Sequence, residues 1–185
     1  MADYNLDYSK IKLDISSREL IQLPDYICKY TNLEILYCSY NNITCLDNIP
    51  PNLKELYCFS NKIISLDNLP IKLEILYCNC NQLISLDNLP STLKELYCDC
   101  NQITSLDNLP STLIEMYCDC NQITSLDNLP PTLKILHCDN NQITSLDNLP
   151  AKLEVLECCD NPLKYDFKPL LENIRFFNTI KKLSS

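Results

Sequence analysis

Residues 97–116 read YCDCNQITSLDNLPSTLIEM, and nearly the same twenty residues recur on both sides of them. The preceding copy, YCNCNQLISLDNLPSTLKEL, begins at Tyr77, and the following copy, YCDCNQITSLDNLPPTLKIL, begins at Tyr117. A fixed period of this length is the signature of a solenoid, in which each repeat forms one coil and stacks on its neighbours. The sequence therefore predicts a single elongated solenoid domain.

The repeated unit follows the pattern L-x-x-L-x-C-x-x-N-x-[IL] in seven consecutive coils, with Met116 once replacing the second Leu. Alternation over L-x-C is typical of a short strand whose Leu and Cys face inward, and we expect parallel strands about 4.8 Å apart. The inward cysteines would be Cys38, Cys58, Cys78, Cys98, Cys118, Cys138 and Cys158. The asparagines, which we expect to form a buried ladder, are Asn41, Asn61, Asn81, Asn101, Asn121, Asn141 and Asn161.

The second half of each coil returns the chain to the start of the next strand. Its nine residues are too few for a helix with two turns, and a proline near the end favours extended geometry. We therefore predict an extended or polyproline-like convex side and a right-handed coil. The chain contains no glycine, so positions with positive φ should be filled mainly by Asn or Asp.

Both ends of the array depart from the pattern. Residues 1–9 are predicted to form an N-terminal cap, residues 10–32 an irregular first repeat, and residues 33–167 seven repeats, the last incomplete. Residues 168–185 are predicted to form a helix and tail, with Leu170, Ile174 and Phe177 at helical spacing. A solenoid needs its open end covered, which favours a capping helix. An amphipathic helix for a membrane or a partner is the alternative.

The repeated pattern resembles the leucine-rich repeat superfamily, with Cys in place of the usual third Leu. The L-D-N-L-P segment is similar to the short, 20-residue class of the repeat found in bacterial secreted effectors. Repeat proteins of giant amoeba-infecting viruses are similar in their Asn- and Cys-rich composition. The resemblance implies an α/β-type solenoid that is mostly β, with a parallel sheet on the concave face, and a function in protein–protein interaction.

Charge and hydropathy indicate which classes of partner and which cellular compartment the sequence favours. The net charge of −9 disfavours nucleic acid and anionic membranes, which require clustered Lys and Arg. No apolar run is long enough to span a bilayer, and the polar N-terminus lacks the features of a signal peptide. We therefore expect an intracellular, reducing compartment, the host cytoplasm if the protein is viral.

The predicted concave face carries the main candidate site. Its central row holds Tyr and one His, and acidic side chains flank it, which favours a protein or peptide partner of basic character. The predicted partner-binding residues are Tyr57, Tyr77, Tyr97, Tyr117, His137, Glu95, Asp99, Glu115, Asp119 and Asp139. The alternative is that stacked Tyr side chains merely support neighbouring strands.

Two further rows are candidates for metal binding, although structural interpretations are favoured for both. Cys80, Cys100 and Cys120 form C-x-C pairs with the inward cysteines, whereas zinc sites favour C-x₂₋₄-C. An Asp-Asn pair recurs in each turn, where stacked carboxylates could hold Ca²⁺ but more often shape the turn itself. These aspartates are Asp47, Asp67, Asp87, Asp107, Asp127 and Asp147.

Catalysis finds little support in the sequence. His137 is the only histidine and stands at a Tyr position, and no separate elements bring a nucleophile, a base and an orienting group together. We predict a non-catalytic scaffold for protein–protein interaction, without catalytic residues, metal or cofactor. A repeat protein that binds metal through Asp rows or C-x-C pairs, and a purely structural repeat protein, are the alternatives. Oligomeric state is not predicted.

Overall fold

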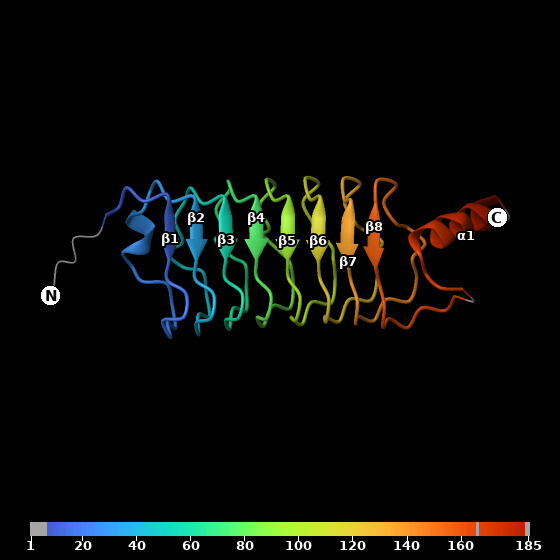
Figure 1. Cartoon of the computed structure of the whole chain (residues 1–185), viewed down its shortest axis with the longest axis horizontal. Coiled ribbons are helices and arrows are strands. Elements are labelled where there is room, and N and C mark those ends of the chain that lie inside the picture. Colours follow the sequence, from blue (N-terminus) through green and yellow to red (C-terminus); the bar gives the residue numbers. More distant parts are fainter. Residues whose placement is uncertain (1–6, 166, 184–185) are drawn as a thin grey trace.

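The computed structural model describes residues 7–165 and 167–183 and shows an elongated solenoid (Figure 1). Most of the predicted N-terminal cap, residues 1–6, lies outside the described residues. Eight three-residue strands form one parallel sheet in sequence order along the long axis. They are β1 (Lys12–Asp14), β2 (Ile35–Tyr37), β3 (Glu55–Tyr57), β4 (Ile75–Tyr77), β5 (Glu95–Tyr97), β6 (Glu115–Tyr117), β7 (Ile135–His137) and β8 (Val155–Glu157).

Equivalent positions of neighbouring coils pair with one another throughout the sheet. Leu76 pairs with Leu96, and Tyr77 pairs with Tyr97, so each repeated residue becomes a continuous row along the solenoid. The middle residue of each strand from β2 to β7 is buried, as are the inward cysteines. The predicted alternation and the parallel sheet are therefore confirmed.

The convex side is built from turns and extended backbone. Residues 38–54 and their equivalents up to residue 154 contain no helix. The carbonyl of Pro90 accepts a hydrogen bond from the Leu93 amide at 3.1 Å, and the same turn recurs in other coils. Thr112 then joins two coils, because its hydroxyl donates to the carbonyls of Ser91 and Leu93 at 2.8 and 2.7 Å. A short 3₁₀ helix, η1 (Ile27–Lys29), occurs in the irregular first repeat.

The asparagine row forms the predicted buried ladder. The side-chain amide of Asn101 donates to the carbonyls of Cys78 and Cys98 at 3.1 and 3.0 Å. Its oxygen accepts the backbone N–H of Leu83, in the preceding coil, at 2.9 Å. One side chain thus satisfies buried backbone groups of two coils, which would otherwise destabilise the fold.

Positive φ angles are less confined to Asn and Asp than predicted. Among the described residues with positive φ, six are Asn or Asp: Asn48, Asn68, Asn88, Asn108, Asn140 and Asp160. The other seven are of different types: Ser17, Glu19, Tyr40, Ser60, Cys80, Cys100 and Cys120. The second group shows that the backbone bonds between coils impose this conformation even where the side chain does not favour it. Cys100, for example, has φ 53° while its amide donates to the carbonyl of Asp119 at 2.9 Å.

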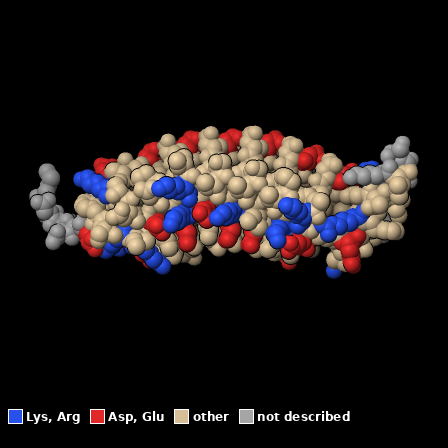
Figure 2. Space-filling model, turned by 90° about the horizontal axis from the view of Figure 1, so that it is seen from above, with Lys and Arg blue, Asp and Glu red and all other residues tan. Residues whose placement is uncertain are grey.

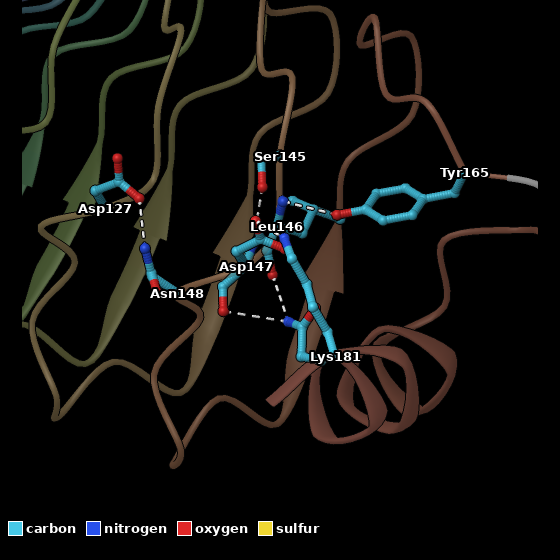
Figure 3. Close-up of polar contacts among 8 residues, drawn as sticks. Asp127, Ser145, Leu146, Asp147, Asn148, Tyr165 and Lys181 are labelled. Carbon is cyan, nitrogen blue, oxygen red and sulfur yellow. Dashed lines mark hydrogen bonds and ion pairs between the residues drawn. The ribbon is translucent and has the colours of Figure 1, made fainter. Parts of the chain in front are cut away.

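The C-terminal end is covered by helix α1 (Leu171–Leu183), which confirms a capping helix. The helix starts three residues later than predicted, after Pro169, and it inserts Ile174 into the core. Figure 3 shows how it is held: Lys181 contacts Asp147 at 2.7 Å, and the Tyr165 hydroxyl accepts the Leu146 amide N–H at 2.9 Å. Of the helices in the described residues, none has the length and apolar character needed to cross a membrane.

Candidate functional site

The concave face is formed by the strand residues that point away from the core, together with the residue two positions after each strand. Its central row is a stack of five tyrosine rings, Tyr37, Tyr57, Tyr77, Tyr97 and Tyr117. Successive ring centroids lie 4.5, 4.8, 3.9 and 4.5 Å apart, with interplanar angles of 20° or less. We call this row the tyrosine stack. Because the parallel register places one ring in each coil, the stack runs across five strands.

A side chain other than Tyr contacts each end of the tyrosine stack: Lys12 at Tyr37 and His137 at Tyr117. The ammonium group of Lys12 lies 4.6 Å from the centroid of the Tyr37 ring, an arrangement that gives a cation–π attraction. At the other end His137 lies 4.5 Å from Tyr117, tilted by 33°, and its Nδ1 is 3.3 Å from a Glu157 carboxylate oxygen. His137 therefore extends the stack, as its repeat position predicts.

The hydroxyl groups of Tyr57 and Tyr97 are held in their protonated form by their surroundings. Burial raises the pKa of Tyr57 and Tyr97 well above the ordinary value of 10.0. The Tyr57 hydroxyl also donates to the Glu55 carboxylate at 2.9 Å, which raises its pKa further. The stack thus offers neutral hydrogen-bond donors at the rim of apolar rings.

One side of the stack carries two neighbouring carboxylates. Glu95 and Glu115 are paired directly across β5 and β6. Burial raises the pKa of Glu95, and the negative charge of Glu115 raises it further. Like charges placed opposite each other on adjacent strands are destabilising, so Glu95 and Glu115 repel each other across the sheet.

On the other side, Asp99, Asp119 and Asp139 form a row that also has a structural role. The Oδ1 atom of Asp99 accepts the backbone N–H of Asp119 at 2.9 Å, and Asp119 accepts that of Asp139 at 2.7 Å. Asp139 in turn accepts the N–H of Cys159 at 2.6 Å. Burial raises the pKa of Asp99 and Asp119, opposed by these backbone hydrogen bonds. Sequence reasoning missed these bonds, since their donors belong to the next coil.

The structure brings the ten predicted partner-binding residues onto the same face. The Tyr residues and His137 are half-buried, with their neighbours Glu95, Glu115, Asp99, Asp119 and Asp139 beside them. Oppositely charged side chains alternate along one edge of the molecule in Figure 2, in agreement with ion pairs such as Lys94–Glu74 at 2.7 Å. Acidic side chains line the middle of the other edge.

The two rows considered for metal differ in structure. The turn aspartates bond to neighbouring side chains: Asp107 accepts from the Ser105 hydroxyl at 2.7 Å and from the Asn128 amide at 2.6 Å. The C-x-C pairs do not converge, because Cys98 is buried while Cys100 is exposed. Within residues 7–165 and 167–183, no group of three or more His, Cys, Asp or Glu side chains is arranged to hold one metal ion.

Sequence reasoning also missed an apolar hollow at the C-terminal end. It has a volume of about 560 Å³ and is lined by residues of α1 and by Phe167, which precedes the helix. The side chains of Phe176 and Ile180 are 70% and 47% exposed there. Helix α1 therefore has apolar side chains on its surface as well as in the core. The lining residues are Phe167, Asn173, Phe176, Phe177, Ile180 and Lys181.

Comparison with known proteins connects this geometry to one family. A family model for leucine-rich repeats (two copies) matches residues 31–71. YopM from Yersinia enterocolitica WA-314 is 32% identical with a TM-score of 0.68 over 89% of this chain and 41% of that one. A Shigella effector leucine-rich repeat domain is 29% identical with a TM-score of 0.73, over 95% and 76% of the two chains.

A third solved structure bears on the cysteine rows. The functional domain of InlJ from Listeria monocytogenes, described as including a cysteine ladder, is 36% identical with a TM-score of 0.62. The match covers 85% of this chain and 41% of that one. A search of curated proteins gives no match. The likeness to giant-virus repeat proteins stays a prediction.

Proposed function

We propose that this chain, which belongs to the leucine-rich repeat superfamily, is a non-catalytic scaffold that binds a protein or peptide on its concave face. The tyrosine stack is the observation that carries the proposal. Each ring is fixed by its neighbours at 3.9 to 4.8 Å, so binding would order few side chains. The loss of side-chain conformational entropy is a main cost of association. Tyr contributes a large contact area while losing little of this entropy.

A basic partner is the second part of the proposal. Glu95 and Glu115 repel each other, and a Lys or Arg placed between them would relieve that repulsion. Within the chain, the Lys12 ammonium group lies 4.6 Å from the Tyr37 ring centroid, which supports an attraction between this row and cations. A chain with a net charge of −9 would also attract a basic partner over longer distances.

The proposal that the chain is not an enzyme rests on the arrangement of its reactive groups. His137 is used in the stack and in its contact with Glu157. Burial raises the pKa of Cys38 to about 12 and also raises the pKa of Cys78 and Cys98 well above the ordinary value, which keeps these thiols unreactive. The inward cysteine row is therefore best explained as core packing.

Selection of binding peptides tests the proposal even while the natural partner is unidentified. Peptides selected from a random displayed library against the wild-type chain should be rich in Lys and Arg. The double variant Glu95→Lys, Glu115→Lys should lose these peptides. The matched control, Asp107→Lys with Asp127→Lys, makes the same change in net charge on the convex turns and should keep them.

Two results would contradict the proposed site. If the convex control loses the peptides as completely as the concave variant, then net charge alone explains the binding. If the selected peptides bind the Glu95→Lys, Glu115→Lys variant unchanged, the contact lies elsewhere. A further variant, Tyr77→Ala, Tyr97→Ala, Tyr117→Ala, should also lose the peptides if the tyrosine stack supplies the contact area.

A further inference from the structure

Three exposed cysteines stand in one row at the rim of the sheet, outside the site described above. Cys80, Cys100 and Cys120 occupy the same position in three consecutive coils, and we call them the outer thiol row. Their φ angles are 53°, 53° and 55°, so the three residues share one backbone conformation. The row ends at Ser60 on one side and at Asn140 on the other, at the same repeat position.

The thiols of the outer row lie beside one another across the coils. The amides of Cys80, Cys100 and Cys120 donate to carbonyls of the next coil at 2.8 to 2.9 Å, which sets the spacing of the row. The parallel register of β4, β5 and β6 places the exposed Cys100 thiol between those of Cys80 and Cys120 in the adjacent coils. The cysteines therefore group between coils, and not within the C-x-C pairs that the sequence suggested.

The spacing of the row distinguishes between the kinds of chemistry that grouped thiols support. Equivalent atoms of stacked coils repeat at about 4.8 Å. A disulfide requires Cβ atoms about 3.5 to 4.5 Å apart, which is less than that repeat. A metal–thiolate bond is about 2.3 Å long, so two such bonds in a line join sulfur atoms about 4.6 Å apart. The row fits a linear, two-coordinate ion better than it fits a disulfide.

We propose that the outer thiol row binds a soft, two-coordinate cation such as Cu(I), held between Cys100 and one neighbouring cysteine. Soft thiolate ligands favour Cu(I), zinc and iron–sulfur clusters, and of these Cu(I) suits two ligands in a line, whereas structural zinc takes four. The row cannot form a three- or four-coordinate site because its members lie along a line, in agreement with the absence of convergent groups in the described residues. The proposed copper site does not depend on whether the concave face binds a partner.

The surroundings of the row favour a positively charged ion. Asp99 and Asp119 each precede a cysteine of the row and carry the negative charge of the neighbouring concave face. Binding is a proton exchange without a redox step. Two S–H bonds break, two S–Cu bonds form, and two protons pass to the solvent, with copper supplied and retained as Cu(I).

Cys100 is the residue that the geometry makes indispensable. It is adjacent to both other thiols, whereas Cys80 and Cys120 are separated by two coils, about 9.6 Å, which a single linear ion cannot span. Substitution by Ser is compatible with the fold, because Ser60 has φ 54° at the same position. The variant Cys100→Ser therefore tests the site with little disturbance of the chain.

The test is competition for Cu(I) against a chromogenic chelator, using the full chain, reduced and under nitrogen. The wild type, Cys80→Ser and Cys120→Ser should each withdraw one equivalent of Cu(I), and Cys100→Ser should lose this equivalent. Cys28→Ser, which removes an exposed thiol of the first repeat, is the matched control and should behave as the wild type. Equal urea midpoints would show that Cys100→Ser remains folded.

Copper X-ray absorption of the loaded wild type provides an independent readout, with two sulfur neighbours expected. The proposal is overturned if the wild type withdraws no copper, or if Cys100→Ser competes as well as the wild type. A coordination number of three or more, or nitrogen and oxygen ligands, would also overturn it. Formation of a Cys80–Cys100 or Cys100–Cys120 disulfide in preference to copper binding would show that the thiols approach more closely than the coil repeat allows.

Discussion

The asparagine ladder and the aspartate row both join neighbouring coils through side-chain hydrogen bonds, but they lie in different surroundings. Asn101 is 8% exposed and bonds to backbone groups of its own and the preceding coil. Asp99 is half-buried at the rim of the concave face and accepts one backbone N–H of the next coil. A neutral amide fills the buried position because a charge there would cost far more than it could recover from bonding.

This difference indicates how much each row contributes to stability. The asparagine amide satisfies both donors and acceptors that water cannot reach, whereas the group bonded to Asp99 lies close to solvent. Hydrogen bonds add little net stability, but an unsatisfied buried group carries its full desolvation cost. We therefore expect the asparagine ladder to contribute much more to the stability of the solenoid than the aspartate row does.

The largest effect is expected for Asn101→Leu. The substitution leaves the Leu83 amide without its acceptor. It also removes one of the two side-chain donors of the Cys78 and Cys98 carbonyls, which keep Asn81 and Asn121 respectively. The unpaired amide costs about 1–3 kcal/mol and each of the two lost hydrogen bonds about 1 kcal/mol, so we expect the free energy of unfolding to fall by about 3 kcal/mol. Urea denaturation monitored by circular dichroism measures this change.

Asn161→Leu is the matched control for that experiment. Asn161 makes the same kinds of bond, with Ile143, Cys138 and Cys158, but it is only half-buried in the last coil. Solvent can replace part of its bonding, so the loss should be clearly smaller than for Asn101→Leu. Equal losses would show that burial does not decide the strength of the ladder.

A smaller effect is expected for Asp119→Ala. It removes the acceptor of the Asp139 amide, at a position where Ser39 and Phe59 stand in earlier coils. We expect the free energy of unfolding to fall by about 1 kcal/mol. Asp119→Asn keeps a side-chain oxygen as acceptor and should not show this loss; if both variants lose the same amount, the hydrogen bond is not the cause.

The residues that the sequence predicted best are those whose role depends on the period alone. The inward Leu and Cys, and the asparagine ladder, occupy one position in each coil, and alternation is enough to turn them toward the core. The same period predicted that the Tyr residues and His137 would form one row.

The features that the sequence did not reveal depend on how one coil sits on the next. Asp99 bonds to an amide twenty residues away, and only the rise between coils brings that donor within 2.9 Å. Cys100 adopts a positive φ because its amide must meet the Asp119 carbonyl, which no local preference of Cys would suggest. Helix α1 is likewise joined to a distant coil, because the Asn178 amide donates to the Leu146 carbonyl at 2.8 Å.

The two kinds of aspartate should respond to pH with opposite sign. Burial raises the pKa of Asp99 and Asp119 above 3.8, so the folded chain holds protons that the unfolded chain has released, and stability falls as pH rises through that window. For Asp107 and Asp127, hydrogen bonds from Ser and Asn lower the pKa below 3.8. Their contribution is present above 3.8 and is lost as pH falls below it.

Two double variants separate these contributions. Compared with the wild type, Asp99→Asn, Asp119→Asn should raise the urea midpoint at about pH 6, and Asp107→Asn, Asp127→Asn should lower it slightly. The first difference should shrink as the pH falls below 3.8, where Asp99 and Asp119 become protonated in either state. The second should shrink as the pH falls from 3.8 through the lowered pKa values of Asp107 and Asp127. A shift of the same sign in both variants would show that net charge, and not local burial, governs the response.

The smallest effect is expected for Lys94→Ala, although Lys94 and Glu74 also join neighbouring coils, at 2.7 Å. Both side chains are close to half exposed, at 49% and 43%, so water screens their attraction and competes for their hydrogen bonds. We expect the free energy of unfolding to change by no more than about 0.5 kcal/mol. A loss as large as that of Asn101→Leu would mean that charge, rather than the exclusion of water, gives a contact between coils its strength. Because the three contacts differ mainly in their access to solvent, their measured order tests that cause directly.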